Sequence, residues 1–341
     1  MAKSPFTFID LFAGIGGFHL GLQKIGGKCV YASEWDKFSS ITYEAWFPEI
    51  QVDKRDIREV KISREIPSHD VLAGGFPCQP FSLAGVSKKN SLGVKHGFED
   101  INQGNLFLHI CEIIRIRQPK VVFLENVKNL VSHDNGQTWI VIQQALESLG
   151  YQIHWKIIDA KFWVPQHRER IYIVAFRKKS FTNKEINSFC FPVEPHIPPK
   201  LSSILDTKTP KKYMLSDRLW AYLVTYSDKH KKLGNGFGYS IADPASHART
   251  LSARYYKDGS EILIRVPYWK NPRRISPAEA ARLMGFDNSW GLKLGNGFPQ
   301  LVSDTQAYRQ FGNAVCPHVV LAIGQEIKRV LTMRNGRLSR S

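Results

Sequence analysis

The chain has 341 residues, and 43% of them are hydrophobic, which is enough for a large buried core. The formal net charge of +17 favours a polyanionic partner, with nucleic acid as the first choice and an anionic membrane surface as the rival. Five widely spaced cysteines without a C-x-x-C pair argue against a disulfide framework or a zinc site. Without a signal peptide or an apolar run of about 20 residues, we expect a cytoplasmic protein with no membrane span and no metal.

The positive charge is concentrated in the second half of the chain. Residues 1–180 carry 23 Lys and Arg against 18 Asp and Glu, whereas residues 181–341 carry 24 against 12. We therefore expect the second half to face a polyanion and the first half to be an ordinary globular domain.

Strand and helix signals alternate along the first 180 residues. Compact apolar runs predict buried strands at Phe6–Leu11, Lys28–Ser33, Val71–Ala73, Val121–Leu124 and Ile171–Phe176. Apolar residues at helical spacing predict helices at Phe18–Ile25, Leu106–Arg117 and Trp139–Leu149. This alternation predicts an α/β fold with a doubly wound, mostly parallel sheet.

The pattern changes near Lys178. Residues 181–272 read as short irregular runs with crowded prolines, and a capping-box pattern at Ser276–Glu279 begins a new helix. We predict one domain of residues 1–180 plus about 303–332, a smaller irregular domain with a hinge over 181–302, and a frayed basic tail at 333–341.

A glycine-rich loop, Asp10–Gly17, lies between the first predicted strand and the first helix. Doubly wound folds bind nucleotide-like cofactors at this position, but the spacing is not G-x-G-x-x-G, which disfavours a dinucleotide. Glu34 ends the second strand, where a carboxylate can hold ribose hydroxyls, and Trp35 can pack on an adenine. The alternative is a tight turn with no ligand.

Cys78 follows the strand at 71–73, after two glycines and between Pro77 and Pro80. The carboxyl end of a parallel strand is a usual place for an active site, and an activated thiolate is a strong nucleophile. The alternative is a small buried cysteine. The polar segment that follows reads either as a loop closing over a polyanion or as a solvated loop.

Glu125 comes directly after the strand Val121–Leu124, where burial can raise the pKa of a carboxyl and make it a proton donor. Arg168 and Arg170 alternate before the next strand, so both point to one face and can hold a carbonyl oxygen and a carboxylate. The alternatives are a capping acid and a surface ion-pair cluster with Glu169.

Taken in order, these motifs resemble the DNA (cytosine-5) methyltransferases. The resemblance also includes Asp56-Ile57, Gly104–Phe107, Arg274–Phe286 and Gln310–Val315, and it runs along nearly the whole chain. It implies S-adenosylmethionine as cofactor, with S-adenosylhomocysteine as product. The implied cofactor site consists of Phe12, Ala13, Gly14, Gly16, Glu34, Trp35, Asp56, Ile57, Pro77, Leu106, Asn313 and Ala314.

The resemblance also implies the roles of the catalytic residues. Cys78 would add to C6 of a cytosine flipped out of duplex DNA, Glu125 would protonate N3, and Arg170 would hold O2. Arg168 would support the site around the nucleophile. Such an enzyme is expected to act as a monomer, and a cognate restriction endonuclease can accompany it as a separate protein.

The region 181–302 would then be the target-recognition domain. Segments 234–239 and 249–259 resemble the Dcm-type branch, which methylates the inner cytosine of CC(A/T)GG or CCNGG. We expect DNA contacts, to bases or to phosphates, from Ser82, Lys88, Lys89, Asn235, Thr250, Arg254 and Lys257. The rival hypotheses are a tRNA cytosine-5 methyltransferase, a non-catalytic DNA-binding regulator and a nicotinamide oxidoreductase.

Overall fold

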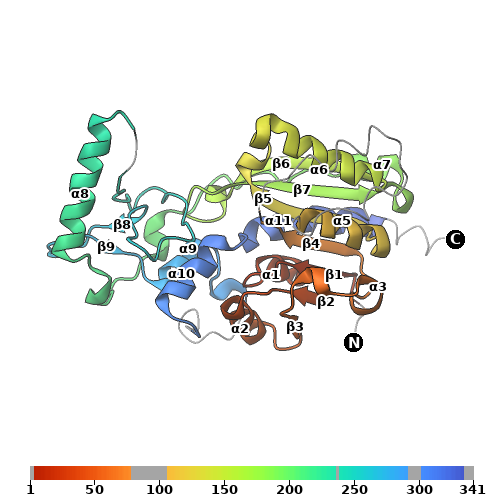
Figure 1. Cartoon of the computed structure of the whole chain (residues 1–341), viewed down its shortest axis with the longest axis horizontal. Helices are drawn as coiled ribbons and strands as arrows, with labels where there is room; N and C mark the ends of the chain where they lie inside the picture. The colour runs from red at the N-terminus through yellow and green to blue at the C-terminus, as the bar shows by residue number, and fades with distance from the viewer. Residues whose placement is uncertain (1–3, 78–105, 236–237, 291–300, 334–341) are drawn as a thin grey trace.

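The computed structural model describes residues 4–77, 106–235, 238–290 and 301–333. A seven-stranded sheet with flanking helices forms the larger part, and a smaller part with a two-stranded sheet lies at the other end (Figure 1). The strands are β1 (Phe6–Leu11), β2 (Gly27–Ser33), β3 (Val52–Asp53), β4 (Val71–Gly75), β5 (Val121–Val127), β6 (Tyr151–Asp159), β7 (Glu169–Arg177), β8 (Leu263–Ile264) and β9 (Arg273–Arg274).

The large sheet has the order β3-β2-β1-β4-β5-β7-β6. Strands β1 to β5 pair in parallel, and β7 is antiparallel to both of its neighbours, β5 and β6. The central strands are almost entirely buried because helices cover both faces, as their continuous apolar runs predict. The predicted doubly wound, mostly parallel α/β fold is confirmed.

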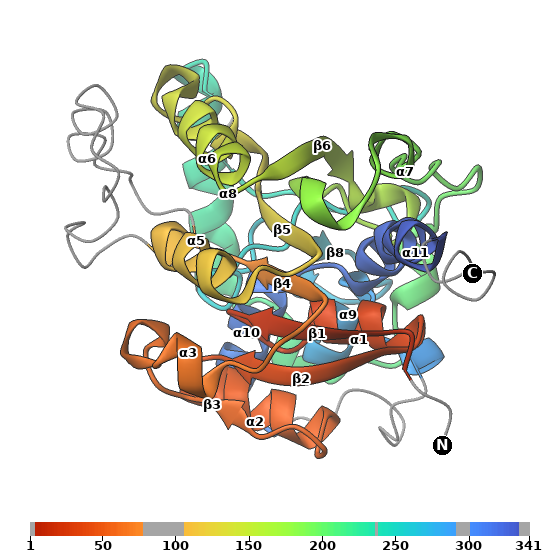
Figure 2. The same cartoon turned by 90° about the vertical axis from the view of Figure 1, so that its right-hand side faces the viewer.

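Helices lie on both faces of the large sheet (Figure 2). One buried cluster joins α1 and α11 to the sheet, and a second joins α3, α5 and α6 to the opposite face. The helices are α1 (Gly17–Lys24), α2 (Lys37–Trp46), α3 (Ile62–Glu65), α5 (Leu106–Arg117), α6 (Gln137–Ser148), α7 (Asn183–Asn187), α8 (Asp217–Lys232), α9 (Pro277–Leu283), α10 (Asp304–Asn313) and α11 (Pro317–Met333).

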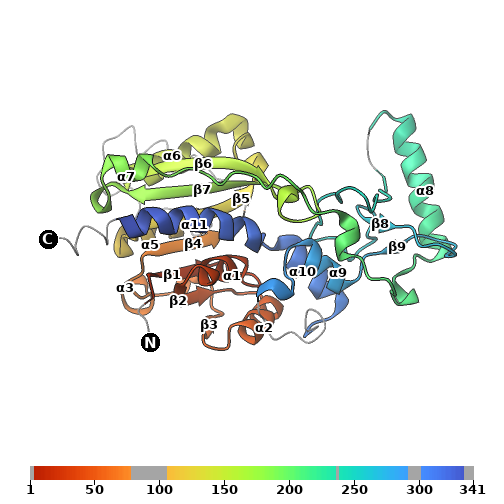
Figure 3. The same cartoon turned by 180° about the vertical axis from the view of Figure 1, so that it is seen from behind.

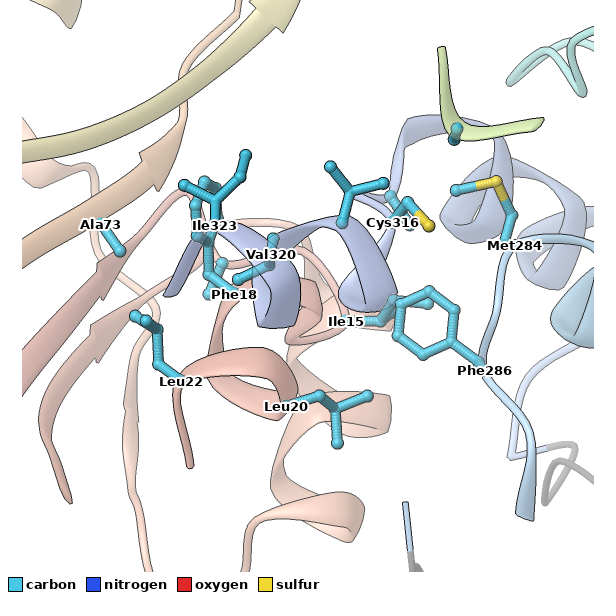
Figure 4. Packing of buried hydrophobic residues seen from close by; sticks show 14 of the residues in the cluster. Ile15, Phe18, Leu20, Leu22, Ala73, Met284, Phe286, Cys316, Val320 and Ile323 are labelled. Atoms are coloured by element: carbon cyan, nitrogen blue, oxygen red, sulfur yellow. The ribbon is translucent and has the colours of Figure 1, made fainter. Parts of the chain in front are cut away.

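Helix α11 returns the end of the chain to the sheet, where it packs on α1 (Figures 3 and 4). Phe18 and Leu22 of α1 meet Val320 and Ile323 of α11 in one buried cluster. The N- and C-terminal segments thus share a core, which fixes the glycine loop before α1 relative to the segment between α10 and α11.

The smaller part contains the capping box that the sequence predicts. The Ser276 side chain accepts a hydrogen bond from the Glu279 backbone, and Pro277 occupies the first turn of α9. Helix α8 was not predicted, because its apolar residues are few and its last turn is rich in lysine. Within the described ranges no helix is both long and apolar enough to cross a membrane.

Candidate active site

A cavity of about 580 Å³ opens at the carboxyl ends of β1, β2, β4 and β5. Ligands bind at this edge in doubly wound sheets because the loops that leave the parallel strands converge there. Phe12 and Gly14 come from the end of β1 and the loop after it, and Ser33 and Glu34 come from the end of β2. Gly75 to Pro77 come from the end of β4. Strand β5 supplies Glu125 to Val127, and α10 closes another side.

Glu34 is held in place by the backbone on either side of it. The N–H of Gly14 donates to Oε2 and the N–H of Asp36 donates to Oε1, both at 2.8 Å. Burial raises the pKa of the carboxyl, and these two hydrogen bonds oppose the shift. Each oxygen keeps a lone pair for a hydroxyl of a ligand. Beside it, Trp35 lines the cavity with 70% of its surface exposed.

Asp56 and Ile57 form the opposite rim of this half of the cavity. Asp56 caps a short helical turn and pairs with the guanidinium of Arg58, which lowers the pKa of Asp56 to about 2. Ile57 is buried and gives the rim an apolar surface. The base of a nucleoside can therefore lie between the apolar rim and Trp35, with its sugar near Glu34.

The other half of the cavity contains the end of β4. Gly75 pairs with Glu125 of β5, and the side-chain amide of Asn126 donates to the carbonyl of Phe76 at 2.8 Å. Both contacts fix the backbone that leads to Cys78, two residues beyond Phe76. Cys78 itself lies outside the described residues.

Glu125 and Arg170 face each other across β5 and β7. Their Oε1 and Nε atoms are 3.2 Å apart, and the side chains are only 10% and 16% exposed. Burial raises the pKa of Glu125, while the positive charges of Arg170 and Arg168 act in the opposite direction. This pair presents a carboxyl that can carry a proton beside a fixed hydrogen-bond donor.

Arg168 is buried and connects three segments of the chain. Its guanidinium donates to the carbonyls of Leu251 at 3.3 Å, Gly312 at 3.0 Å and Ala314 at 2.8 Å. Burial lowers its pKa to about 10. Arg168 lines the same cavity as Arg170, as the alternating pattern predicts, but its guanidinium bonds to backbone carbonyls.

Most of the predicted catalytic and cofactor residues line this one cavity. The residues in the lining are Phe12, Gly14, Glu34, Trp35, Asp56, Ile57, Pro77, Leu106, Glu125, Arg168, Arg170 and Asn313.

Ala13, Gly16 and Ala314 lie behind this lining. Gly16 has φ +86°, and a Cβ there would come 2.3 Å from the Phe47 ring, so glycine serves the turn and its packing. The Ala13 N–H donates to the Ser33 carbonyl, and the Ala314 carbonyl accepts from Arg168.

The residues predicted to contact DNA are spread over the smaller part. The hydroxyl of Thr250 donates to the carbonyl of His167 at 2.5 Å, and Asn235 pairs with His230 at 2.6 Å. Arg254 and Lys257 are exposed. Ser82, Lys88 and Lys89 lie outside the described residues.

In the wall of the cavity that α10 provides, the predicted site includes Asn313 alone. Gln306, Arg309 and Gln310 line it together with Asn313. They precede Asn313 by seven, four and three residues, so all four share one helix face. Helical periodicity counted back from Asn313 would have identified them. Ser39 of α2 also lines the cavity, and its backbone N–H donates to Asp36, the N-cap of that helix.

Comparison with known proteins agrees with this geometry. The model of the C-5 cytosine-specific DNA methylases matches residues 6–329. A DNA-cytosine methyltransferase of Escherichia coli is 45% identical over 98% of this chain and 82% of its own length. The type II methyltransferase M1.ScrFI of Lactococcus lactis is 44% identical over 96% of this chain and 79% of its own.

The fold is similar to solved structures as well. A Spodoptera frugiperda DNMT2 mutant has a TM-score of 0.70 at 18% identity, covering 95% of this chain and 99% of its own. At that identity the likeness shows the fold alone, whereas the family match and the close relatives show the activity. The chain belongs to the C-5 cytosine-specific DNA methylases and is a DNA (cytosine-5) methyltransferase.

Proposed function

We propose that the cavity binds S-adenosylmethionine in one half and a flipped-out cytosine in the other, with Cys78 as the nucleophile. The observation that carries this proposal is the Glu125–Arg170 pair, which lies beside the anchored Gly75–Pro77 segment. Both line the cavity that also contains Glu34 and Trp35. The carboxyl of Glu125 and the guanidinium of Arg170 would meet N3 and O2 of cytosine, and the proposal assigns C6 to the Cys78 thiol.

The donor set of the first half fits a nucleoside. Glu34 retains a lone pair on each oxygen for the ribose hydroxyls, and Trp35 and Ile57 provide flat and apolar contact for adenine. Phe12, Asp56, Leu106 and Asn313 would complete the site. The bound cofactor supplies an electrophilic methyl group. The described residues include no cluster of three potential metal ligands.

The residues of the second half would make cytosine nucleophilic at C5. The Cys78 thiolate forms a bond to C6 while N3 takes a proton from Glu125, and Arg170 donates to O2. C5 is then enamine-like and accepts the methyl group. The C5 proton then passes to water, the thiolate departs from C6, and N3 returns its proton to Glu125, which restores the ring and the carboxyl. Extruding the base from the duplex costs about a few kcal/mol.

We assign residues 181–302 to target recognition, and residues 1–180 with about 303–332 to catalysis. The Dcm-type resemblance of segments 234–239 and 249–259 supports the inner cytosine of CC(A/T)GG or CCNGG as the target. The protein would act as a monomer on cytosolic DNA, and type II relatives support a separate cognate endonuclease.

The chemistry is tested with duplexes that carry 5-fluorocytosine at the target position. Fluorine cannot leave as a proton does, so a covalent protein–DNA adduct should accumulate in the presence of S-adenosylmethionine. Cys78→Ser should form no adduct. Cys190→Ser, which changes an exposed cysteine, should form as much adduct as the parent. An adduct that survives Cys78→Ser would refute the assignment of the nucleophile.

The target sequence is tested by bisulfite sequencing of DNA from a methylation-free host that expresses the protein. Protected cytosines should fall at the inner position of CC(A/T)GG or CCNGG. Methylation confined to GCGC or GGCC would contradict the proposal.

A further inference from the structure

Helix α8 of the smaller part presents to solvent a stripe of five side chains, three of them basic. Only Leu223 and Ser227 are buried among its 16 residues. Its stripe residues are spaced at i, i+4, i+7, i+11 and i+14, which places them along one side of a helix. They are Arg218, Tyr222, Thr225, Lys229 and Lys232, and we call them the α8 stripe.

The cations of the α8 stripe outnumber the acids of the same helix. No acidic residue occupies a stripe position; Asp217 pairs with Lys270, and Asp228 lies four residues before Lys232, so it is a neighbour of Lys232 on the helix surface. Arg218, Lys229 and Lys232 form no ion pair with any residue that the structure describes. Other lysines of the same part are paired: Lys212 with Asp304 at 3.0 Å and Lys270 with Asp217 at 2.7 Å.

Helix stability alone does not explain the stripe. Cations in the last turn of a helix interact favourably with its dipole, by about 0.3–1 kcal/mol each, which accounts for Lys229 and Lys232. Arg218 lies in the first turn, where the same dipole disfavours a cation. A ligand that runs along the helix accounts for all three charges.

Three ring side chains of α8, one of them from the stripe itself, lie next to one another along the helix. The rings of Tyr222 and Tyr226 are stacked at 5.9 Å, and Tyr226 lies 4.2 Å from the ring of His230. Asn235 holds His230 in turn at 2.6 Å. Tyr222 is 58% exposed and lies between Arg218 and Lys229 in the stripe. Hydroxyls and cationic side chains are the groups that contact nucleic-acid backbones.

No residue of α8 belongs to the lining of the candidate active site. Helix α8 stands at the opposite end of the molecule from α7 and the end of β7 (Figures 1 and 3). From Arg218 to Lys232 it extends about 21 Å, close to the rise of about six base pairs. We propose that the α8 stripe binds the phosphate backbone of the duplex that flanks the target site. This inference rests on the proposed function only in taking duplex DNA as the substrate.

The test is a triple variant that removes charge but keeps good helix formers: Arg218→Gln, Lys229→Gln and Lys232→Gln. A matched control, Lys178→Gln, Lys179→Gln and Lys184→Gln, removes the same charge from exposed lysines at the other end of the molecule. Fluorescence anisotropy with a duplex carrying about 15 base pairs on each side of the target gives Kd at several salt concentrations.

The α8 variant should lower the slope of log K against log salt by about 2 to 3, and weaken binding at low salt at least about tenfold. The control should keep the parent slope. Single-turnover methylation at saturating DNA and the sequence methylated should not change. An unchanged slope in the α8 variant would overturn the proposal.

A second measurement uses duplex length. Trimming the flanks to about three base pairs should lower the affinity of the parent to that of the α8 variant and leave the variant unaffected. Equal losses in both proteins, or a defect seen with an RNA hairpin and not with duplex DNA, would contradict the assignment. If no adduct formed with 5-fluorocytosine but the α8 variant still bound duplex DNA more weakly, the proposed nucleophile would be refuted and the α8 proposal would stand.

Discussion

At the scale of single residues, Glu125 carries the most specific chemistry. Its carboxyl is buried, its pKa is raised by that burial, and Arg170 lies at 3.2 Å. Glu125→Gln keeps the shape and the pair with Arg170 but supplies no acidic proton to N3. We expect the single-turnover methylation rate to fall by at least about 100-fold, with cofactor affinity within about threefold of the parent.

The matched control is Glu169→Gln, one residue before Arg170 on β7. Glu169 is exposed and pairs with Lys128, so its change should leave the methylation rate near that of the parent. Glu125→Gln with nearly full activity would exclude Glu125 as the proton donor.

The raised pKa of Glu125 also predicts how stability depends on pH. The folded state binds the carboxyl proton more tightly than the unfolded state, whose carboxyl has its ordinary value of 4.5. This stabilising contribution is complete below 4.5 and is lost as pH rises through the folded pKa. Glu125→Gln stays neutral, so denaturant titrations should show the parent losing stability relative to the variant above 4.5. A difference independent of pH would contradict the raised pKa.

Sequence reasoning located Glu125 and Arg170 because both lie where strands end or begin, and neighbouring strands bring such residues together. It could not assign the partners of Arg168, since those three carbonyls come from segments that only the tertiary fold places nearby. Nor could it predict the hydrogen bond from the Asn126 side chain to the Phe76 carbonyl, which depends on how β4 and β5 are aligned.

At the scale of elements, the central parallel strands β1, β4 and β5 were predictable because burial on both faces makes them continuous apolar runs. The two-residue parallel strand β3 was not predicted. Strand β6 was missed for the opposite reason: it is an edge strand, and Trp155 and Ile157 on it are partly exposed. Helix α8 was missed because its surface is adapted to solvent, with only Leu223 and Ser227 buried, so the helical apolar period is weak.

Helix α9 depends on a buried ion pair. Arg273 of β9 donates to both oxygens of Glu279, at 2.7 and 2.8 Å, and the two side chains are 3% and 0% exposed. Glu279 also accepts from the backbones of Ser276 and Asp206. Arg273→Leu leaves a buried carboxylate without its cation, so we expect a loss of about 3 kcal/mol in the free energy of unfolding.

Chemical denaturation measures this loss. Lys54→Ala is the control, since its pair with Glu44 is exposed and should contribute less than about 1 kcal/mol. Equal effects of the two changes would show that the buried pair does not stabilise α9.

At the scale of the whole molecule, the two parts meet around the segment that precedes β7. The Gln166 side chain accepts from the Leu251 backbone and donates to the Leu283 carbonyl. Helix α10 approaches residues 252–253 so closely that a Cβ at Gly312 would lie 2.3 Å from the Ala253 nitrogen. Arg168 joins the same segments, so Asn313, which we propose as a cofactor residue, is positioned by contacts from both parts.

Arg168→Lys tests this junction while keeping the positive charge. One ammonium cannot reproduce the planar fork that holds the carbonyls of Leu251, Gly312 and Ala314. We expect the free energy of unfolding to fall by about 3 kcal/mol, because hydrogen bonds to a charged group are lost in a buried place.

Cofactor affinity should fall as well, through Asn313, and hydrogen exchange should increase at residues 251 and 312–314. Arg177→Lys, at the far end of β7 from Arg168, should change none of these quantities. If Arg168→Lys lowered stability but left cofactor affinity and exchange at 312–314 unchanged, Arg168 would stabilise the strand without positioning the cofactor site.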